Sequence, residues 1–385
     1  MKKLFLFLVS TLLFFVFPQL SFSTENKKLE ISGYYKNLFT ASQTRGTQEN
    51  FYGDLQRLRL EVKKDLTPST RFHLAVDNEV FVNDFSNTSD FDFIRSKTQE
   101  RTASWDMDKV SVDNEHVYLK HTIYRAYIEY HQPEFQALLG KQGVDWGKMR
   151  FYSPLDLFNT IAPLELERDQ RIGIDAVNLN YSPHETGGVN FIAAAPTRDS
   201  HDPSLGLKLY KTVASYDCAL AAAKIIKSMV VGFSFDGYVK SAGFRGEITH
   251  TRQDDKRSFP RASVGVDYSF SEKLYVLVEH FYNGGRENND AAAFSSSYKI
   301  SQQVLSQEKN LSSLWIKYSF TPVFHCNNYL IYDWEGKSVV YNPELNYNLS
   351  PNIDISVGPQ LYWGRSNSEF GTTENLYYAE VKWFF

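Results

Sequence analysis

Hydrophobic and polar residues alternate along most of this chain. The pattern is clearest near the end, where the residues of one parity are apolar and those of the other include charged side chains: Tyr377, Ala379, Val381, Trp383 and Phe385 against Tyr378, Glu380, Lys382 and Phe384. Residues 57–63, 124–130 and 352–364 repeat this alternation. Successive side chains of a β-strand point to opposite faces, so each segment predicts a strand with one apolar and one polar face.

Tight turns with Pro or Ser interrupt the alternation, and longer polar stretches lie between them. Several strands end in an aromatic residue before such a turn, as at Tyr130 before Pro133 and at Tyr347 before Pro351. Short turns at one end and long loops at the other are typical of an outer-membrane barrel. The longer polar stretches are residues 41–50, 84–115, 144–169, 197–204, 253–259, 283–310 and 365–374.

The pattern predicts about 18 strands from residue 29 to residue 385. The turn signals are weakest in 205–252, so a total of about 16 strands is the alternative. An open sheet edge in lipid leaves backbone groups unpaired, so the strands are expected to close into a ring. The predicted fold is all-β: a single transmembrane antiparallel up-and-down β-barrel with short periplasmic turns and long extracellular loops.

Composition excludes several other classes of protein. The 385 residues are 42% hydrophobic, 15% aromatic and 22% charged, and the formal net charge is −4. A mean hydropathy of −0.39 disfavours a bundle of membrane-spanning helices, and the aromatic content disfavours disorder. Mild acidity disfavours nucleic acid as a partner, and two cysteines are too few for a disulfide scaffold.

The first residues have the order of a secretory signal. Lys2 and Lys3 precede an apolar run from Leu4 to Phe17, and the small residues Ser21 and Ser23 follow. Residues 1–23 are therefore predicted to be a cleaved signal peptide, and residues 24–385 the barrel. An uncleaved anchor helix is the alternative, although the run is short for a membrane span of about 20 residues. Cleavage removes two lysines and no acid, so the net charge changes from −4 to −6.

Two motifs resemble those of a known group of proteins. Phe385 at the end of the chain, in phase with Trp383 and Val381, resembles the C-terminal assembly signal of Gram-negative outer-membrane barrels. The second motif comprises Gly140-Lys141-Gln142, Trp146-Gly147, residues 153–159 (SPLDLFN) and residues 171–175. It resembles a strand and long loop of porin-like families, including the alginate-exporter-like barrels. The resemblance implies location in the outer membrane, contact with its lipid, and assembly by the barrel assembly machinery through Phe385.

A barrel of this size encloses an aqueous channel, and the polar face of each strand should line it. Both signs of charge occur there in similar numbers, which predicts only a modest ion bias rather than the strong selection of a single-sign ring. The alternative for each residue is pairing with a neighbour. The predicted pore-lining residues are Arg57, Arg59, Glu61, Arg125, Glu129, Arg245, Glu247, Glu279, Lys317, Glu344, Asp354, Glu380 and Lys382.

Residues 144–170 are the candidate constriction loop. Five large apolar residues in it are better buried than solvated, which favours packing against the inner wall: Trp146, Phe151, Leu155, Leu157 and Phe158. An outer lid over the rim is the alternative. The more polar 84–115 loop is interpreted as external and mobile. Constriction residues expected to face the lumen are Asp145, Lys148, Arg150, Asp156, Glu165, Glu167, Arg168 and Asp169.

Nothing in the sequence predicts catalysis. The nine histidines are scattered over different strands and turns, and no nucleophile elbow, paired-histidine helix motif or phosphate-binding glycine loop is present. The sequence therefore assigns no catalytic, cofactor-binding or metal-ligating residue and indicates that the protein is not an enzyme. Cys218 and Cys326 fall on distant predicted strands, so two free thiols are expected.

Two functions are consistent with this pattern. The first is a porin with a water-filled channel for passive diffusion of ions and small hydrophilic solutes. The alternative is a substrate-specific outer-membrane channel or a polysaccharide exporter of the alginate-exporter-like kind. A packed structural barrel ranks third, and the sequence leaves the oligomeric state open.

Overall fold

The computed structural model describes most of the chain. The described residues are 29–43, 49–83, 104–105, 107–159, 163–166, 170–197, 201–255, 257–286, 306, 308–366, 368–371 and 373–385. The predicted signal peptide, residues 1–23, lies outside them, so its cleavage remains a prediction.

Nineteen strands of one sheet lie within the described residues. The first ten are β1 (Leu29–Gln43), β2 (Asn50–Thr67), β3 (Thr70–Asn83), β4 (Asp108–Asp113), β5 (Val117–Gln132), β6 (Phe135–Gln142), β7 (Ile174–His184), β8 (Gly187–Ala194), β9 (Ser204–Val213) and β10 (Tyr216–Ile225). The others are β11 (Ser228–Val239), β12 (Ala242–Gln253), β13 (Ser258–Ser269), β14 (Leu274–Asn283), β15 (Asn310–Thr321), β16 (Phe324–Asp333), β17 (Ser338–Ser350), β18 (Ile353–Trp363) and β19 (Leu376–Phe384).

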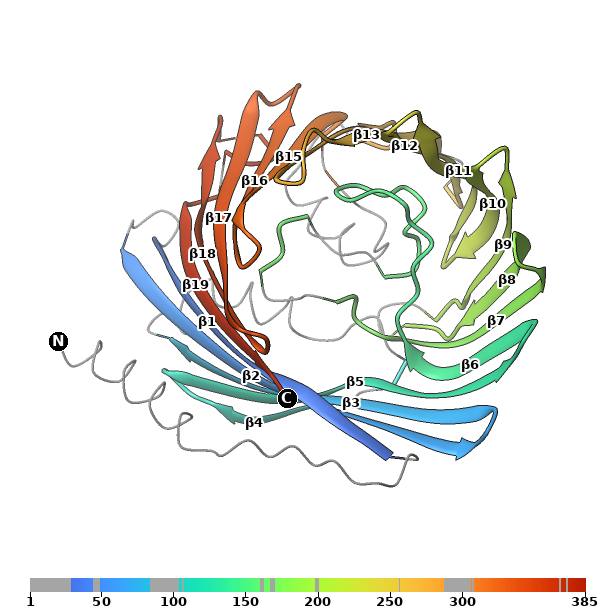
Figure 1. The fold of residues 1–385 in the computed structure, drawn as a ribbon, viewed down its shortest axis with the longest axis horizontal. Coiled ribbons are helices and arrows are strands. Elements are labelled where there is room, and N and C mark those ends of the chain that lie inside the picture. Colours follow the sequence, from blue (N-terminus) through green and yellow to red (C-terminus); the bar gives the residue numbers. More distant parts are fainter. Residues whose placement is uncertain are drawn as a thin grey trace.

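All of these strands except β4 follow one another around a closed ring. Each pairs antiparallel with the next, and β19 pairs with β1 to close the barrel, with Lys36 opposite Lys382. Figure 1 shows this ring, with the β1–β19 seam beside the C-terminus. The predicted all-β barrel is confirmed, and eighteen strands rather than sixteen form its wall.

No helix in the described part of the chain has the length and apolar character needed to cross a membrane.

The interpretation of residues 84–115 as one external loop was wrong in its last part. Residues Asp108–Asp113 form β4, which pairs with β5 above the point where the short strand β6 ends. Lys120 on β5 forms an ion pair with Asp108 (Nζ to Oδ2, 2.9 Å), and the backbone N–H groups of Ser104 and Trp105 donate to Asp175 on β7. This segment therefore continues the wall between β5 and β7. Residues 84–103 of the loop lie outside the described residues.

The alternation sorts side chains between the lumen and the outer surface. On β19, Tyr378, Glu380 and Lys382 face inward, where Lys36 of β1 lies 2.7 Å from Glu380. One position breaks the expected phase: Tyr124 was predicted on the outer face with Ala126. The register of β3 and β5 shifts at Ala75 and Val76, so Tyr124 is an extra residue of β5. This bulge turns its ring inward, against the guanidinium of Arg59.

The outer surface carries the aromatic residues expected beside the short turns. Tyr130, Tyr181, Tyr268, Phe270, Tyr318, Phe320 and Tyr347 are all exposed. Cys218 and Cys326 lie on β10 and β16 and are both free, as predicted.

Candidate functional site

A long loop enters the barrel after β6, which has only eight residues. Near the end of β6, Gly140 has a φ of +124°, and a Cβ at this position would lie 2.3 Å from the carbonyl oxygen of Ala126. Only glycine accepts both the backbone angle and this close approach. The described residues between β6 and β7, which are 143–159, 163–166 and 170–173, run inside the ring, as the green trace in Figure 1 shows.

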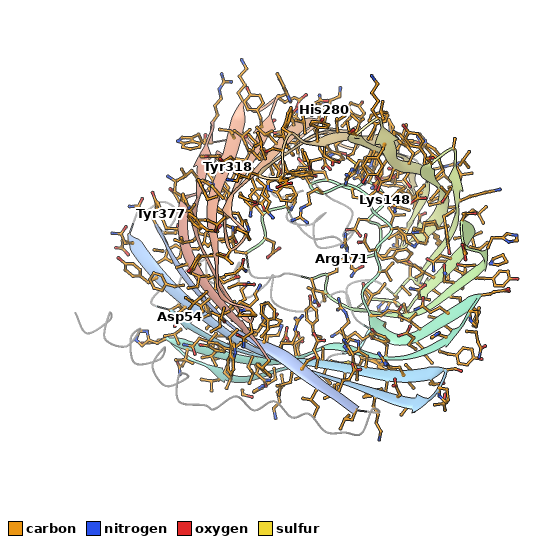
Figure 2. All side chains as sticks on the ribbon, viewed as in Figure 1. Asp54, Lys148, Arg171, His280, Tyr318 and Tyr377 are labelled. Carbon is orange, nitrogen blue, oxygen red and sulfur yellow. The ribbon has the colours of Figure 1, made fainter. Side chains whose placement is uncertain are left out.

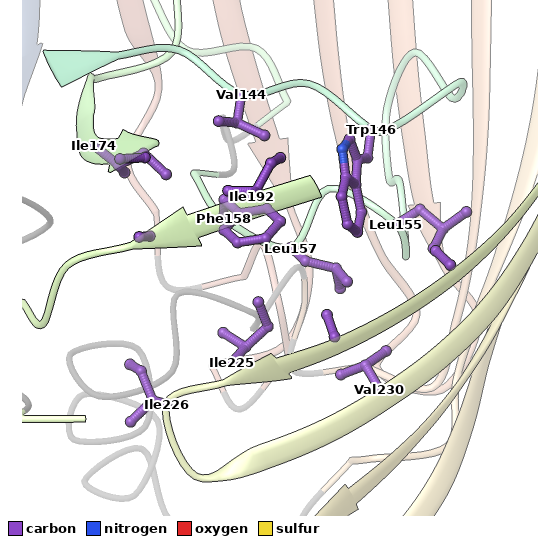
Figure 3. Close-up of a cluster of buried hydrophobic side chains, with 14 residues drawn as sticks. Val144, Trp146, Leu155, Leu157, Phe158, Ile174, Ile192, Ile225, Ile226 and Val230 are labelled. Atoms are coloured by element: carbon purple, nitrogen blue, oxygen red, sulfur yellow. The ribbon is translucent and has the colours of Figure 1, made fainter. Parts of the chain in front are cut away.

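The first half of the loop packs on an apolar part of the inner wall. Trp146, Leu155 and Phe158 are buried among Ile192 on β8 and apolar residues of β7, β10 and β11 (Figure 3). The indole N–H of Trp146 donates to Asn190 Oδ1 at 2.8 Å. The full cluster is Val144, Trp146, Leu155, Leu157, Phe158, Ile174, Ala176, Ile192, Ala194, Ala221, Ala223, Ile225, Ile226 and Val230.

The sequence of β10 already contains a signal of this apolar wall. Residues 219–223 read Ala-Leu-Ala-Ala-Ala, so both faces of β10 are apolar. A strand that faced lipid on one side and water on the other would alternate. Small side chains also make room for the loop, since a Cβ on Gly206 would lie 2.5 Å from the Trp146 ring.

A second apolar cluster holds residues 151–152, which lie between Trp146 and Leu155 in the chain, on a different part of the wall. Phe151 and Tyr152 pack against side chains of β14 to β17. The Tyr152 ring stacks on Phe281 with centroids 5.2 Å apart, and its carbonyl accepts a bond from Ser263 Oγ at 2.6 Å. The loop thus crosses between two sides of the barrel.

Two wall carboxylates accept the backbone N–H groups of the loop. Glu279 of β14 accepts from Arg150 N at 2.8 Å and from Phe151 N at 2.9 Å. Glu247 of β12 accepts from Leu155 N at 3.0 Å, from Ser153 Oγ at 2.7 Å, and from Lys148 N. Both glutamates are almost fully buried. We call them the carboxylate clamp.

The carboxylate clamp changes the interpretation of two predicted pore-lining residues. Glu247 and Glu279 do point inward, as the alternation requires, but the loop covers them, and their carboxylate oxygens accept hydrogen bonds from it. Strand periodicity gives the direction of a side chain and contains no information on what lies over it.

An ion pair closes the base of the loop. The Arg171 guanidinium donates to Asp156 (NH2 to Oδ2, 2.8 Å; Nε to Oδ2, 3.1 Å), and its NH1 lies 3.2 Å from Asp145 Oδ2. Asn159 accepts from Val144 N and donates to the carbonyl of Ile172 at 2.5 Å. Asp156 was expected to face the lumen; the structure instead buries it beside Arg171.

The exposed side chains of the loop are charged. Asp145, Lys148 and Arg150 are exposed, whereas the stretch from Phe151 to Asn159 is buried. Figure 2 shows Lys148 and Arg171 inside the ring. The Arg150 guanidinium lies 5.1 Å from the Trp315 ring centroid on β15. Among its described residues, the loop therefore carries two exposed cations and one exposed carboxylate toward the lumen.

Beside the end of the loop, β2 and β3 hold buried ion pairs, and Tyr124 of β5 lies next to them. Arg59 binds both oxygens of Asp77 (2.5 and 2.6 Å) and donates to Gln170 Oε1 at 3.0 Å, with the ring of Tyr124 3.7 Å from its Cζ. Arg57 lies 2.6 Å from Glu79. These two predicted pore-lining arginines are thus paired and almost fully buried.

The remaining predicted wall residues face inward with polar partners close by. Three of them lie in ion pairs: Glu61 is 3.9 Å from Lys63, Lys382 is 3.4 Å from Glu380, and Arg245 pairs with Asp267. Three carboxylates accept hydrogen bonds: Glu129 from Gln136 at 2.6 Å, Glu344 from Tyr378 at 2.9 Å, and Asp354 from Asn348 at 2.5 Å. Arg125 donates to the backbone carbonyl of Arg171. Lys317 is half-buried on β15, Glu165 is half-buried in the loop, and Glu167, Arg168 and Asp169 lie outside the described residues.

Three carboxylates at the long-loop end lie close enough to be considered as metal ligands. Oxygens of Glu308, Asp333 and Glu335 lie within 4.8 Å of one another in the described part of the chain. Asp333 already accepts from two backbone N–H groups and from Ser338 Oγ, and Arg286 lies 2.9 Å from Glu308. Local hydrogen bonds therefore account for this group without an ion.

The acidity of Asp156 makes the loop sensitive to pH. Burial raises the pKa of Asp156 to about 7, against the opposing effect of Arg171, while Asp145 and Glu247 raise it further. A solvated aspartate has a pKa of about 4. Between about pH 4 and about pH 7, Asp156 therefore keeps its proton while the loop is packed on the wall and loses it when the loop leaves the wall. Rising pH thus destabilises the packed (seated) loop across that window and has no further effect above it.

We therefore expect single-channel conductance to rise between about pH 4 and about pH 7, with a midpoint inside that window, and to stay constant above the pKa of Asp156. The neutral variant Asp156→Asn should give a flat profile in this window, whereas Glu129→Gln, on β5 away from the loop, should keep the wild-type profile. An unchanged midpoint in Asp156→Asn would contradict this assignment.

Comparison with solved structures finds the same fold at low sequence identity. OccAB1 from Acinetobacter baumannii matches with a TM-score of 0.61 at 10% identity, over 95% of this chain and 99% of that one. The outer membrane protein OprD from Pseudomonas aeruginosa matches with a TM-score of 0.59 at 10% identity, over 94% and 95%. OccAB3 from A. baumannii gives 0.58 at 11% identity, over 93% and 99%. No protein-family model and no curated protein matches the chain.

Proposed function

We propose that this chain is an outer-membrane porin that forms a water-filled channel for passive diffusion of ions and small hydrophilic solutes. The observation that carries the proposal is a closed barrel with polar inner faces and a fixed loop across its interior. The fold likeness to the outer membrane protein OprD supports this location, as do the predicted signal peptide and the aromatic residues beside the short turns. Residues 144–170 act in this proposal as the constriction.

A substrate-specific channel, or an exporter of the alginate-exporter-like kind, is the second candidate. The observation that favours it is the rigid attachment of the loop: two apolar clusters and the carboxylate clamp hold it in one position. A passage of constant shape with Asp145, Lys148 and Arg150 at its edge can select solutes by size and charge. We further propose that the protein is not an enzyme, because passive diffusion of solutes through the proposed channel involves no catalytic step.

Assembly by the barrel machinery through Phe385 belongs to the same proposal. The backbone of Phe385 pairs with Gly33 in both directions, N–H to carbonyl, at 2.9 and 3.1 Å. This residue therefore extends the pairing of the β1–β19 seam that closes the barrel. In the proposed topology both this seam end and the short turns face the periplasm.

Single-channel conductance of the refolded mature protein in a planar bilayer tests the proposal. Discrete open steps, with a small reversal potential in a salt gradient, are expected of the porin. Full block of the current by one added sugar or organic acid would favour the substrate-specific channel. The absence of any current would contradict both.

Reversing the exposed charges of the loop should change ion selectivity. Lys148→Glu with Arg150→Glu places two carboxylates where two cations now face the lumen, so the reversal potential should shift toward cation preference. The matched control is Lys211→Glu with Lys273→Glu, which makes the same change of net charge at exposed positions by the short turns. Equal shifts in both variants would mean that the loop does not border the ion path.

A further inference from the structure

Three cations gather on the outer surface at the long-loop end of β10, β11 and β12. Lys224 of β10 lies opposite Met229 of β11, and Met229 lies opposite Arg252 of β12. Lys227 is in the β10–β11 turn beside them. Neighbouring strands are about 4.8 Å apart, so the Cα atoms of Lys224 and Arg252 are about 10 Å apart. Both long side chains can reach one point above Met229. We call Lys224, Lys227 and Arg252 the basic rim.

In this part of the wall, apolar residues of β10 and β11 face the lumen, and the cations of β10 and β12 face the outer surface. Ala221, Ala223 and Val230 face inward and are buried against the loop. The residues that alternate with them face outward, so Lys224 and Arg252 point away from the lumen and are exposed. The basic rim therefore plays no part in the channel.

An apolar band lies directly below the basic rim. Leu220, Val231 and Ile248 on the same three strands are 60%, 53% and 51% exposed. In a membrane this band contacts acyl chains. The cations stand at its upper edge, at the depth where lipid headgroups begin.

Other strands carry aromatic residues at their long-loop ends, which marks the same lipid-headgroup level, whereas β10–β12 differ. At the long-loop end, Trp334 directly after β16, Trp363 of β18 and Tyr377 of β19 are exposed aromatic residues. Tyr and Trp commonly mark the headgroup level. Among the described residues of β10–β12, this level has no outward aromatic side chain and has cations instead.

The charge of the basic rim is not neutralised within the described part of the chain. None of its three cations pairs there with a carboxylate, whereas Arg257 in the next turn is paired with Asp255 at 2.5 Å. A single lysine at this depth is ordinary, because its long stem lets the charge reach water. Three unpaired cations around one exposed methionine concentrate positive charge where an anion can bind all of them.

We propose that the basic rim binds the phosphate of a phosphorylated lipid headgroup in the outer leaflet, with its acyl chains on the apolar band below. Arginine offers two parallel N–H donors to phosphate oxygens, and the lysines add point charges. A carboxylate ligand in solution would not use the apolar band. The proposal requires the barrel to span a membrane, and it does not depend on what passes through the channel.

Native mass spectrometry of the detergent-solubilised mature protein tests this binding, with bisphosphorylated lipid A as the probe and its dephosphorylated form as the comparison. The variant is Lys224→Gln, Lys227→Gln and Arg252→Gln together. The matched control removes three exposed cations at the short-turn end: Lys64→Gln, Lys211→Gln and Lys273→Gln. Single-channel conductance of each sample, expected to equal that of the wild type, verifies folding and reports separately on the channel.

The wild type and the control should bind the bisphosphorylated lipid equally, and the basic-rim variant at least tenfold more weakly. The dephosphorylated lipid should bind all three proteins weakly. Equal binding by the basic-rim variant would overturn the proposal, and so would an equal loss in the control, which would indicate attraction by net charge alone. Wild-type binding of the dephosphorylated lipid as strong as that of the bisphosphorylated lipid would also overturn it.

Discussion

Replacing Glu247 and Glu279 together with alanine is expected to raise the single-channel conductance and its noise. The carboxylate clamp accepts five hydrogen bonds from the loop: those of Lys148 N, Arg150 N, Phe151 N, Ser153 Oγ and Leu155 N. A hydrogen bond to a charged group contributes about 1.5–3 kcal/mol, and a buried donor left without its partner is costly. The seated loop should therefore lose much of its stability, and the passage should widen as the loop leaves the wall.

The matched control is Glu129→Ala. Glu129 also points inward from the wall, but its carboxylate accepts from Gln136 on the neighbouring strand and from none of the described loop residues. Its removal should leave the conductance unchanged. Single replacements at Glu247 and Glu279 should each give a smaller increase than the double variant, because the apolar clusters still hold the loop. A double variant with wild-type conductance and noise would show that the loop does not restrict the path.

Arg59→Ala is expected to destabilise the barrel by about 3–5 kcal/mol, because it leaves the buried carboxylate of Asp77 with only the more distant Arg57, whose Nε is 3.8 Å away. The side chains of Arg59 and Asp77 are each only 2% exposed, and the guanidinium binds both oxygens of Asp77. Urea unfolding of the vesicle-embedded protein, followed by tryptophan fluorescence, measures the change in free energy of unfolding.

Two further variants make this measurement specific. Arg71 pairs with Asp65 on the same two strands, but both side chains are well exposed, so Arg71→Ala should change the free energy of unfolding by only about 0–1 kcal/mol. Replacing Arg59 and Asp77 together with leucine should recover most of the loss, because neither charge of this pair is then left buried and Arg57 keeps its partner Glu79. A loss in the double variant as large as that in Arg59→Ala would show that the rings of Tyr34 and Tyr124 need the guanidinium itself.

The strands, their number and their inward faces could be read from the sequence. Alternation with a period of two is a local property, and residues such as Glu380 and Lys382 show it within nine residues of chain. The turns at Pro133 and Pro351 mark strand ends by the chemistry of proline alone. The same local logic placed Cys218 and Cys326 on separate strands.

Other features depended on contacts between distant parts of the chain. The clamp bonds join residues 92 to 129 positions apart, so no local pattern could show that Glu247 and Glu279 lie beneath a loop. The bulge that turns Tyr124 inward depends on its register with β3, and β4 forms only because β6 ends early beside β5.

The loop between β6 and β7 depends both on its local sequence and on contacts with distant parts of the chain. Its apolar residues already indicated that it has to be buried somewhere, because exposed Trp146 and Phe158 would be costly in water. Which surface buries them was a question of shape: the small residues Gly206, Ala221 and Ala223 come together on the inner wall only after the barrel has closed. Burial is therefore encoded by composition within the loop, whereas its place in the lumen arises from the complementarity of surfaces that folding brings together.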